Sequence, residues 1–141
     1  NYKMRLLKII FFLILTSSTV FAGTNYFNEG LVLYEKKEFD KAKFKFEQDI
    51  VYNPKSEKSY LYLSKIFNKQ DKKDLEKKNL KTVILLNPQN EEATFNLVQL
   101  KFKESDYSGS KKLIEKLLNF CKDYCQKSIK LQTKIEKSIK K

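Results

Sequence analysis

The sequence contains no histidine and no tryptophan, and it has only three glycines and two prolines in 141 residues. Histidine is the commonest general base and metal ligand, so its absence argues against catalytic triads, zinc sites and histidine-ligated haem. Three glycines are too few for a glycine-rich phosphate-binding loop. The scarcity of glycine and proline, with abundant Lys, Leu, Ile and Glu, predicts an all-α protein. We expect neither an enzyme nor a bound cofactor or metal.

Residues 1–22 have the layout of a secretory signal peptide. Met4 is the expected start, and a short basic region and a seven-residue apolar run follow it. Small residues stand three and one before a cut after Ala22, as signal peptidase requires. The alternative is a retained membrane anchor, but residues 9–22 offer only 14 positions, four of them Ser or Thr, where a spanning helix needs about 20 apolar residues. We therefore expect residues 23–141 to be exported to the periplasm or cell envelope.

Beyond this segment the sequence repeats with a period of 34 residues. The clearest sign is Asn53-Pro54, which recurs as Asn87-Pro88. A fixed period of this length indicates stacked supersecondary units, none of which can bury its apolar face alone. The same shift superposes further apolar residues, namely Tyr26 and Tyr60, Leu33 and Phe67, Leu63 and Leu97, Phe46, Leu80 and Ile114, and Ile50, Ile84 and Leu118.

Each repeat is expected to form two helices. Apolar residues recur three and four positions apart, as a one-faced helix requires, and each Asn-Pro pair ends a helix because Pro disfavours helical geometry in the residue before it. The small residues Gly30 and Ala42 would let neighbouring helices approach closely. The pattern predicts seven helices, at about 24–37, 40–52, 57–70, 73–86, 91–104, 107–121 and 125–139.

These residues resemble the tetratricopeptide repeat (TPR) family, as it occurs in exported bacterial-type proteins. The family pattern has an aromatic residue, Leu-Gly, an aromatic, a small residue, an aromatic and a closing Pro. Three units match it in phase, at 23–56, 57–90 and 91–124. The resemblance implies one domain over 23–141, an α-solenoid of three helix-turn-helix repeats. Residues 125–141 carry one narrow apolar stripe, which favours a capping helix over a free basic tail.

The chain departs from the family pattern at two kinds of position. Glu76 stands where the other repeats have Ala42 and Ser110, which puts a charge into a crowded helix crossing, so we expect Glu76→Ala to stabilise the domain. The turn inside each repeat, usually glycine-bearing in the family, has Lys37 in the first repeat. Asp71 and Ser105 occupy the same place in the other two repeats.

In the family, the first helices of successive repeats line a concave groove that takes an extended peptide or a partner helix. Some members clamp a C-terminal carboxylate there, but Phe27 and Leu31 occupy two of the clamp positions, which argues against that activity here. A different interpretation is that some of the aromatic rings turn inward to the core and leave a polar groove. The resemblance assigns the following groove residues: Phe27, Asn28, Leu31, Tyr34, Lys58, Leu61, Tyr62, Lys65, Lys69, Phe95, Asn96, Gln99 and Phe102.

The net charge is strongly positive. After residue 22 there are 26 lysines against 17 acids, a net charge of +9, concentrated in the second repeat and in residues 125–141. These charges form either a solvated surface or a contact for acidic peptides or an anionic surface. Nucleic acid is not an expected partner, because the exported part has no arginine for bidentate base recognition.

Two cysteines remain, Cys121 and Cys125. An even count in an exported chain favours a disulfide, and residues four apart on a helix lie about 6 Å from each other, within reach of a bridge. The alternative is two reduced, partly buried thiols. Their spacing fits neither a thioredoxin-like motif nor haem attachment, and two thiols without histidine are poor zinc ligands.

Taken together, these features predict a protein–protein interaction module, a scaffold or adaptor in the periplasm or envelope. Its partner would be another protein or a peptide. The alternative is a membrane-anchored assembly factor that lays its basic faces on an anionic surface, and it requires that residues 4–22 are retained.

Overall fold

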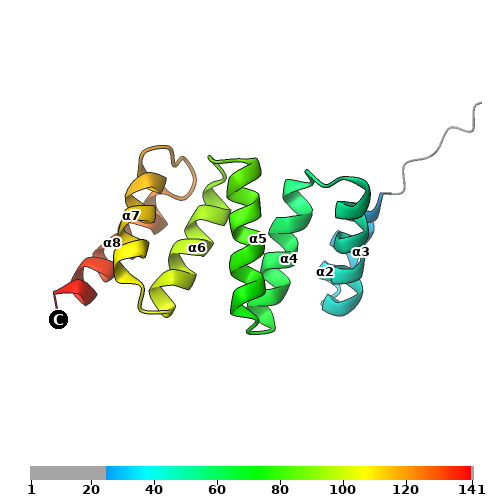
Figure 1. Ribbon diagram of the computed structural model, residues 1–141, viewed down its shortest axis with the longest axis horizontal. Coiled ribbons are helices and arrows are strands. Elements are labelled where there is room, and N and C mark those ends of the chain that lie inside the picture. Colours follow the sequence, from blue (N-terminus) through cyan, green and yellow to red (C-terminus); the bar gives the residue numbers. More distant parts are fainter. Residues whose placement is uncertain (1–24, 141) are drawn as a thin grey trace, which may run out of the picture.

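The computed structural model describes residues 25–140, which form seven α-helices and no strand (Figure 1). The predicted signal peptide lies outside the described residues. Between Asn25 and Lys140, no helix has the length and apolar character that crossing a membrane requires. The observed helix bounds lie within three residues of the predicted ones. The helices are α2 (Tyr26–Glu35), α3 (Phe39–Tyr52), α4 (Glu57–Lys69), α5 (Lys73–Leu86), α6 (Glu91–Lys103), α7 (Tyr107–Leu118) and α8 (Cys125–Ile139).

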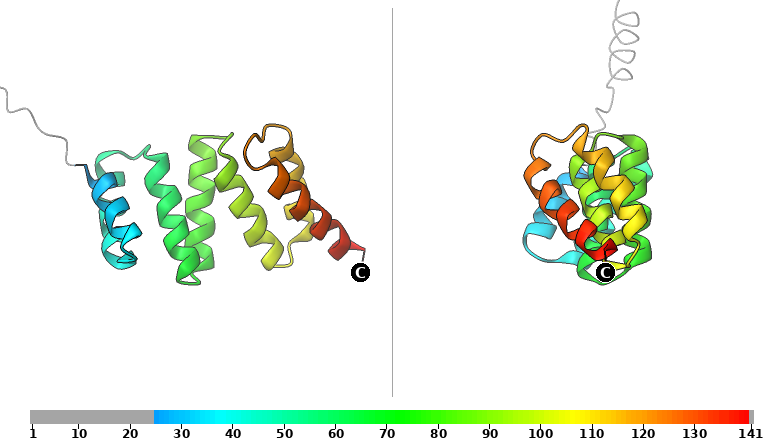
Figure 2. Two further views of the ribbon diagram at one scale, coloured as in Figure 1. Left: turned by 180° about the vertical axis from the view of Figure 1, so that it is seen from behind. Right: turned by 90° about the vertical axis from the view of Figure 1, so that its left-hand side faces the viewer.

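The helices form a single row of antiparallel pairs, α2 with α3, α4 with α5, and α6 with α7, and α8 closes the row (Figures 1 and 2). Each helix packs against the next one along the chain, and α8 also contacts α6. The contacts are therefore local, as expected for an array in which each unit covers its neighbours. The predicted α-solenoid is confirmed.

The turn inside each repeat has one residue in the left-handed region. Lys37, Asp71 and Ser105 have φ angles of 62°, 53° and 61°, and the three are spaced by 34 residues. A left-handed residue just after a helix lets backbone N–H groups reach carbonyls of its last turn, and Lys37 N–H donates to the Tyr34 carbonyl at 2.9 Å. The three repeats therefore turn in the same way although none has glycine at this position.

Three apolar clusters follow one another along the row. The first joins α2, α3 and α4 around Phe46 and Ile66, the second joins α4, α5 and α6 around Leu80, and the third joins α6, α7 and α8 around Ile114 and Ile135. All five of these side chains are fully buried. Each cluster thus crosses from one repeat to the next or to α8, and α8 covers the outer side of the third cluster.

Small residues set the helix separation, as predicted. A Cβ atom on Gly30 would lie 2.7 Å from the Phe46 ring, so only glycine lets α2 approach α3 this closely. Ala42 and Ser110 are completely buried at equivalent positions of α3 and α7. Glu76 occupies the same position on α5 with 5% of its surface exposed, and it accepts a hydrogen bond from Asn68 Nδ2 at 2.9 Å. The charge in the helix crossing therefore has a partner.

Carboxylates at the start of α4 and α6 hold the turn that follows their own repeat. Glu57 accepts a hydrogen bond from the side chain of Asn87 at 3.0 Å, and also one from Asn90. One period later, Glu91 Oε2 accepts from the backbone N–H groups of Lys122 at 2.8 Å and Tyr124 at 2.9 Å. The turn after the third repeat has no Asn-Pro pair, but the carboxylate at the same repeat position, Glu91, still binds it.

Candidate functional site

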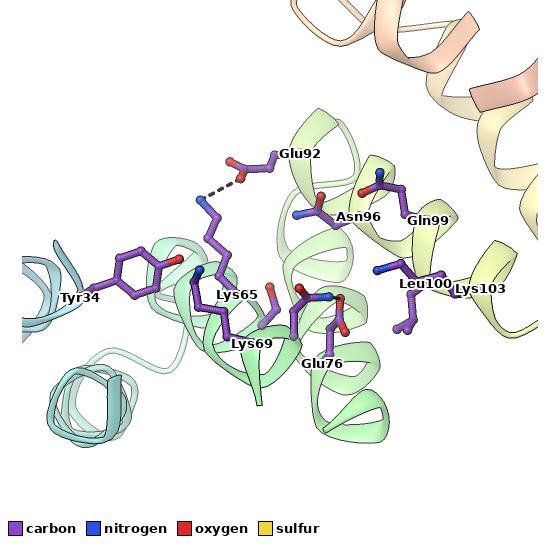
Figure 3. Close-up of a pocket in the computed structure, with 11 residues that line it drawn as sticks. Tyr34, Lys65, Lys69, Glu76, Glu92, Asn96, Gln99, Leu100 and Lys103 are labelled. Carbon is purple, nitrogen blue, oxygen red and sulfur yellow. Dashed lines mark hydrogen bonds and ion pairs between the residues drawn. The ribbon is translucent and has the colours of Figure 1, made fainter. Parts of the chain in front are cut away.

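The described residues enclose a cavity of about 300 Å³ on the side of the row formed by the first helices of the repeats. Its walls come mainly from α4 and α6, while α2 and α5 add one residue each (Figure 3). Because each repeat contributes the same helix face, the 34-residue period itself builds this site. The lining residues are Tyr34, Ser64, Lys65, Asn68, Lys69, Glu76, Glu92, Asn96, Gln99, Leu100 and Lys103.

The cavity is polar and carries charges of both signs. Three lysines and two glutamates line it, with amide side chains between them. Lys65 bridges two repeats, because its Nζ lies 2.8 Å from Glu92 Oε1 and 4.6 Å from the centre of the Tyr62 ring. Among the described residues, Lys69 and Lys103 form no ion pair, and Lys69 instead lies 5.2 Å from the centre of the Phe39 ring. These two lysines carry the cationic charge that a ligand would meet.

Two groups in the cavity wall have shifted pKa values. Burial raises the pKa of the Glu76 carboxyl, an effect that the hydrogen bond from Asn68 and the charge of Lys103 reduce. Burial also raises the pKa of the Tyr34 phenol, against the opposing charge of Lys65. The Tyr34 hydroxyl therefore stays protonated at neutral pH and can donate a hydrogen bond.

The amide side chains on α6 are available to a ligand. Within residues 25–140, Asn96 and Gln99 make no side-chain hydrogen bond, and both lie along the cavity wall in Figure 3. An amide side chain both donates and accepts, as does the backbone of an extended peptide. The site thus has the chemistry to hold a peptide backbone through α6, with charged side chains on α4 and α6 beside it.

Five of the thirteen groove residues named from the sequence line this cavity. They are Tyr34, Lys65, Lys69, Asn96 and Gln99. Asn28, Leu31 and Lys58 lie outside it. Asn28 is exposed on α2, Leu31 is half-buried, and Lys58 Nζ lies 5.8 Å from the centre of the Phe27 ring.

The remaining groove residues are apolar, do not line the cavity, and contact the clusters between the helices. Leu61 is buried in the central cluster. Tyr62 stacks on the buried Phe46 ring with centroids 5.2 Å apart and meets Phe27 edge-on at 5.8 Å. Phe95 and Phe102 pack against the third cluster, where Phe95 contacts Tyr124 and Phe102 contacts Tyr107. The four rings are thus half-buried against the clusters, and the walls of the cavity are mainly polar.

Six lining residues were missed from the sequence. Lys103 had a signal, because it repeats Lys69 after 34 residues. Two more were missed, Asn68, which is adjacent to Lys69, and Glu92, which pairs with Lys65. To assign them to the groove, one must know the rotation of each helix to within one residue. The others, Ser64, Glu76 and Leu100, line the cavity although they are themselves buried.

The two cysteines lie at the end of the row, away from the cavity. Cys121 and Cys125 are joined by a disulfide, with Cα atoms 5.2 Å apart, across the turn that leads from α7 into α8. The disulfide encloses Lys122 and Tyr124, whose backbone N–H groups donate hydrogen bonds to Glu91. The turn is therefore constrained by a covalent bond and by hydrogen bonds from the preceding repeat.

Comparison with known proteins identifies the architecture. No family model and no curated protein matches the sequence. Among solved structures, the first TPR domain of Spaghetti (RPAP3), bound to the HSP90 peptide SRMEEVD, superposes with a TM-score of 0.74 at 13% identity, covering 82% of this chain and 91% of that one. The TPR2B domain of yeast Sti1 in its pHsp70 complex gives 0.72 at 12% identity, covering 79% and 94%.

A bacterial protein is similar as well. The type III secretion translocator chaperone SycD of Yersinia enterocolitica superposes with a TM-score of 0.68 at 10% identity, covering 80% of each chain. The two-helix units, their 34-residue period and these superpositions agree. The chain has the fold of a tetratricopeptide-repeat domain.

Proposed function

We propose that this protein is an interaction module that binds an extended peptide segment of a partner protein in the groove of its first helices. The observation that carries the proposal is the cavity between α4 and α6, whose rim offers unpaired amides and lysines. An extended peptide exposes N–H and C=O groups that need partners, and Asn96 and Gln99 supply both kinds. Two of the similar domains were solved with a peptide or a partner bound, which supports the same use of the fold here.

Binding is a better account of this site than catalysis. The two carboxylates in the cavity are both engaged, Glu92 by Lys65 and Glu76 by Asn68. A catalytic pair would require a nucleophile beside a free base, and the sequence has no histidine to act as one. The lining side chains instead form the mixture of donors, acceptors and cations that positions a peptide.

The experiment is a selection from a random-peptide display library on residues 23–141, which contain the whole described core. Enriched peptides are synthesised with a fluorescent label and their affinity is measured by anisotropy. The groove variant combines Asn96→Ala with Lys103→Gln. The control variant combines Thr82→Ala with Lys81→Gln on α5, outside the cavity, and likewise removes one polar side chain and one positive charge.

We expect the groove variant to weaken binding about tenfold or more and the control to leave it unchanged. Circular dichroism melting of both variants shows whether each remains folded. Equal loss of binding in the two variants, or no enriched peptide at all, would refute peptide binding in this groove.

The proposed location is the periplasm or cell envelope, after cleavage behind Ala22. The signal-peptide layout of residues 1–22 supports it, and so does the disulfide, because such bonds persist in oxidising compartments. Intact-mass measurement of the protein from its native source tests both points. A chain beginning at Gly23 and two hydrogens lighter than its reduced form agrees with export, whereas a chain that retains residues 4–22 favours the membrane-anchored alternative.

A further inference from the structure

The last helix, α8, has the same rotation in the row as α6, the first helix of the repeat before it. Thr94 and Leu97 of α6 are buried, and their equivalents 34 residues later, Ser128 and Leu131 of α8, are buried as well. The two helices are in contact, and the view from behind shows α8, in red, following α6 along the row (Figure 2). Because both helices have the same rotation, the positions that line the cavity on α6 face the same side on α8.

On α8 those positions are rich in lysine. Five residues of α6 line the cavity, and all five equivalents on α8 are exposed to solvent. Three of the equivalents are lysines and none is acidic. In order along α6, Glu92, Asn96, Gln99, Leu100 and Lys103 are replaced on α8 by Gln126, Lys130, Thr133, Lys134 and Lys137.

These lysines are not neutralised by the protein itself. Residues 107–140 contain nine lysines and three acids, and none of the nine forms an ion pair with another described residue. All the ion pairs of the described chain lie between Glu29 and Asp106. Lysines so close together repel one another, and a ligand that carries negative charge would relieve this repulsion.

We infer that the groove continues past the cavity onto α8, and that Lys130, Lys134 and Lys137 bind the acidic end of the peptide that the groove holds. This inference rests on the proposed function and adds the partner's chemistry and its direction. In the cavity Glu92 and Glu76 offset two of the three lysines, whereas the equivalent positions of α8 have three lysines and no acid, so acidic side chains gain most at the α8 end. The cationic series at one repeat position, Lys69, Lys103 and Lys137, leads from the cavity to that end.

The spacing of the helices sets the spacing of the acids. Packed helices lie about 8–10 Å apart, and an extended peptide advances about 3.3 Å per residue. One helix step along the groove therefore corresponds to about three peptide residues. Acidic side chains two or four residues apart point to the same side of an extended peptide and can meet successive helices, whereas the same acids in adjacent positions would point to opposite sides.

The test repeats the peptide selection with two further variants of residues 23–141. The α8 variant combines Lys130→Gln, Lys134→Gln and Lys137→Gln. The control combines Lys111→Gln, Lys112→Gln and Lys116→Gln on α7, where the three lysines are also exposed and unpaired within the described chain. The two variants lose the same net charge.

We expect peptides selected on the unchanged protein to carry acidic residues at one end. These peptides should bind the α8 variant about tenfold more weakly and bind the α7 control as before. Moving the acids of one such peptide to adjacent positions at constant composition should also weaken binding. Equal weakening in the two variants would mean non-specific attraction to net charge and would overturn the inference while leaving peptide binding intact. Failure to select any peptide would overturn the proposed function and the inference together.

Sedimentation with vesicles of anionic phosphatidylglycerol distinguishes a membrane contact. If the α8 variant loses vesicle binding while selected peptides still bind it at full affinity, the lysines of α8 serve a membrane surface and the inference is wrong. Unchanged vesicle binding together with weakened peptide binding is the expected result.

Discussion

Lys37 in the first repeat turn holds a backbone conformation that is costly for any residue with a side chain. Its φ angle is 62°, and its side chain is exposed. The left-handed conformation costs an L-residue about 1–2 kcal/mol of stability. Glycine avoids this cost, but it loses more backbone entropy on folding, and that loss offsets part of the gain.

We therefore expect Lys37→Gly to raise the free energy of unfolding by about 0.5–1 kcal/mol, measured by urea denaturation. The matched control is Lys36→Gly, one residue earlier, where φ is −73° and glycine brings no relief of strain. That variant should be less stable than the unchanged protein. A destabilising effect of glycine at both positions would contradict the left-handed turn.

Glu76 provides a prediction about pH. Its pKa is raised above the ordinary 4.5, chiefly by burial, so the ionised form costs stability in the folded state. This cost is present at neutral pH and disappears as pH falls through the raised pKa towards 4.5. Glu76→Gln removes the charge and keeps an oxygen that can accept the hydrogen bond from Asn68.

We expect Glu76→Gln to be more stable than the unchanged protein by about 1 kcal/mol at neutral pH, with the difference shrinking as the solution is acidified. Denaturation midpoints measured across this pH range provide the test. If the difference has the opposite sign at neutral pH, the attraction of Lys103 outweighs the burial cost. Glu76→Ala is a less informative change, because it also removes the acceptor for Asn68 and opens space in the crossing.

At the scale of helices and turns, much of the structure could be predicted from the sequence. The Asn-Pro pairs and the apolar spacing placed all seven described helices within three residues, because both depend on local backbone chemistry. The groove was harder. Tyr62 and Gln99 both lie on first helices, but one packs on the Phe46 ring and the other lines the cavity. Aromatic rings can serve as either core or surface, and only three-dimensional packing decides between them.

The turn before α8 illustrates a second limit of the sequence pattern. It lacks the closing Pro, and Glu91 fastens it from 31 and 33 residues earlier. The two backbone N–H donors lower the pKa of Glu91, so its contribution to stability is present above the ordinary pKa of 4.5 and is lost as pH falls through the lowered value. No local sequence pattern around Lys122 and Tyr124 predicts this contact with Glu91.

We expect Glu91→Ala to increase the rate of hydrogen exchange at the backbone amides of Lys122 and Tyr124. Glu92→Ala is the matched control, because its carboxylate pairs with Lys65 and touches neither amide. NMR-detected exchange at neutral pH measures both. Protection that is unchanged in Glu91→Ala would show that the disulfide alone orders the turn.

At the scale of the whole molecule, each helix is stabilised mainly by its contacts with the neighbouring helices in the row. The third cluster, with Val98, Ile114 and Leu117 fully buried, has α8 as its outer cover, and α8 is joined to the row by a single turn. The state of that turn should therefore decide how firmly the last repeat, and with it the α8 end of the groove, is held.

The disulfide provides the means to test this. Bridging Cys121 and Cys125 closes a short loop, for which chain-entropy reasoning gives a stabilisation of about 2 kcal/mol. We expect a reducing agent to lower the denaturation midpoint of the unchanged protein and to have no effect on a variant with both cysteines changed to serine. Because the array is built of local contacts, the lost protection should be concentrated in α7 and α8, and α2 to α5 should exchange as before. Uniform loss along all the helices would instead mean that the row unfolds as one cooperative unit.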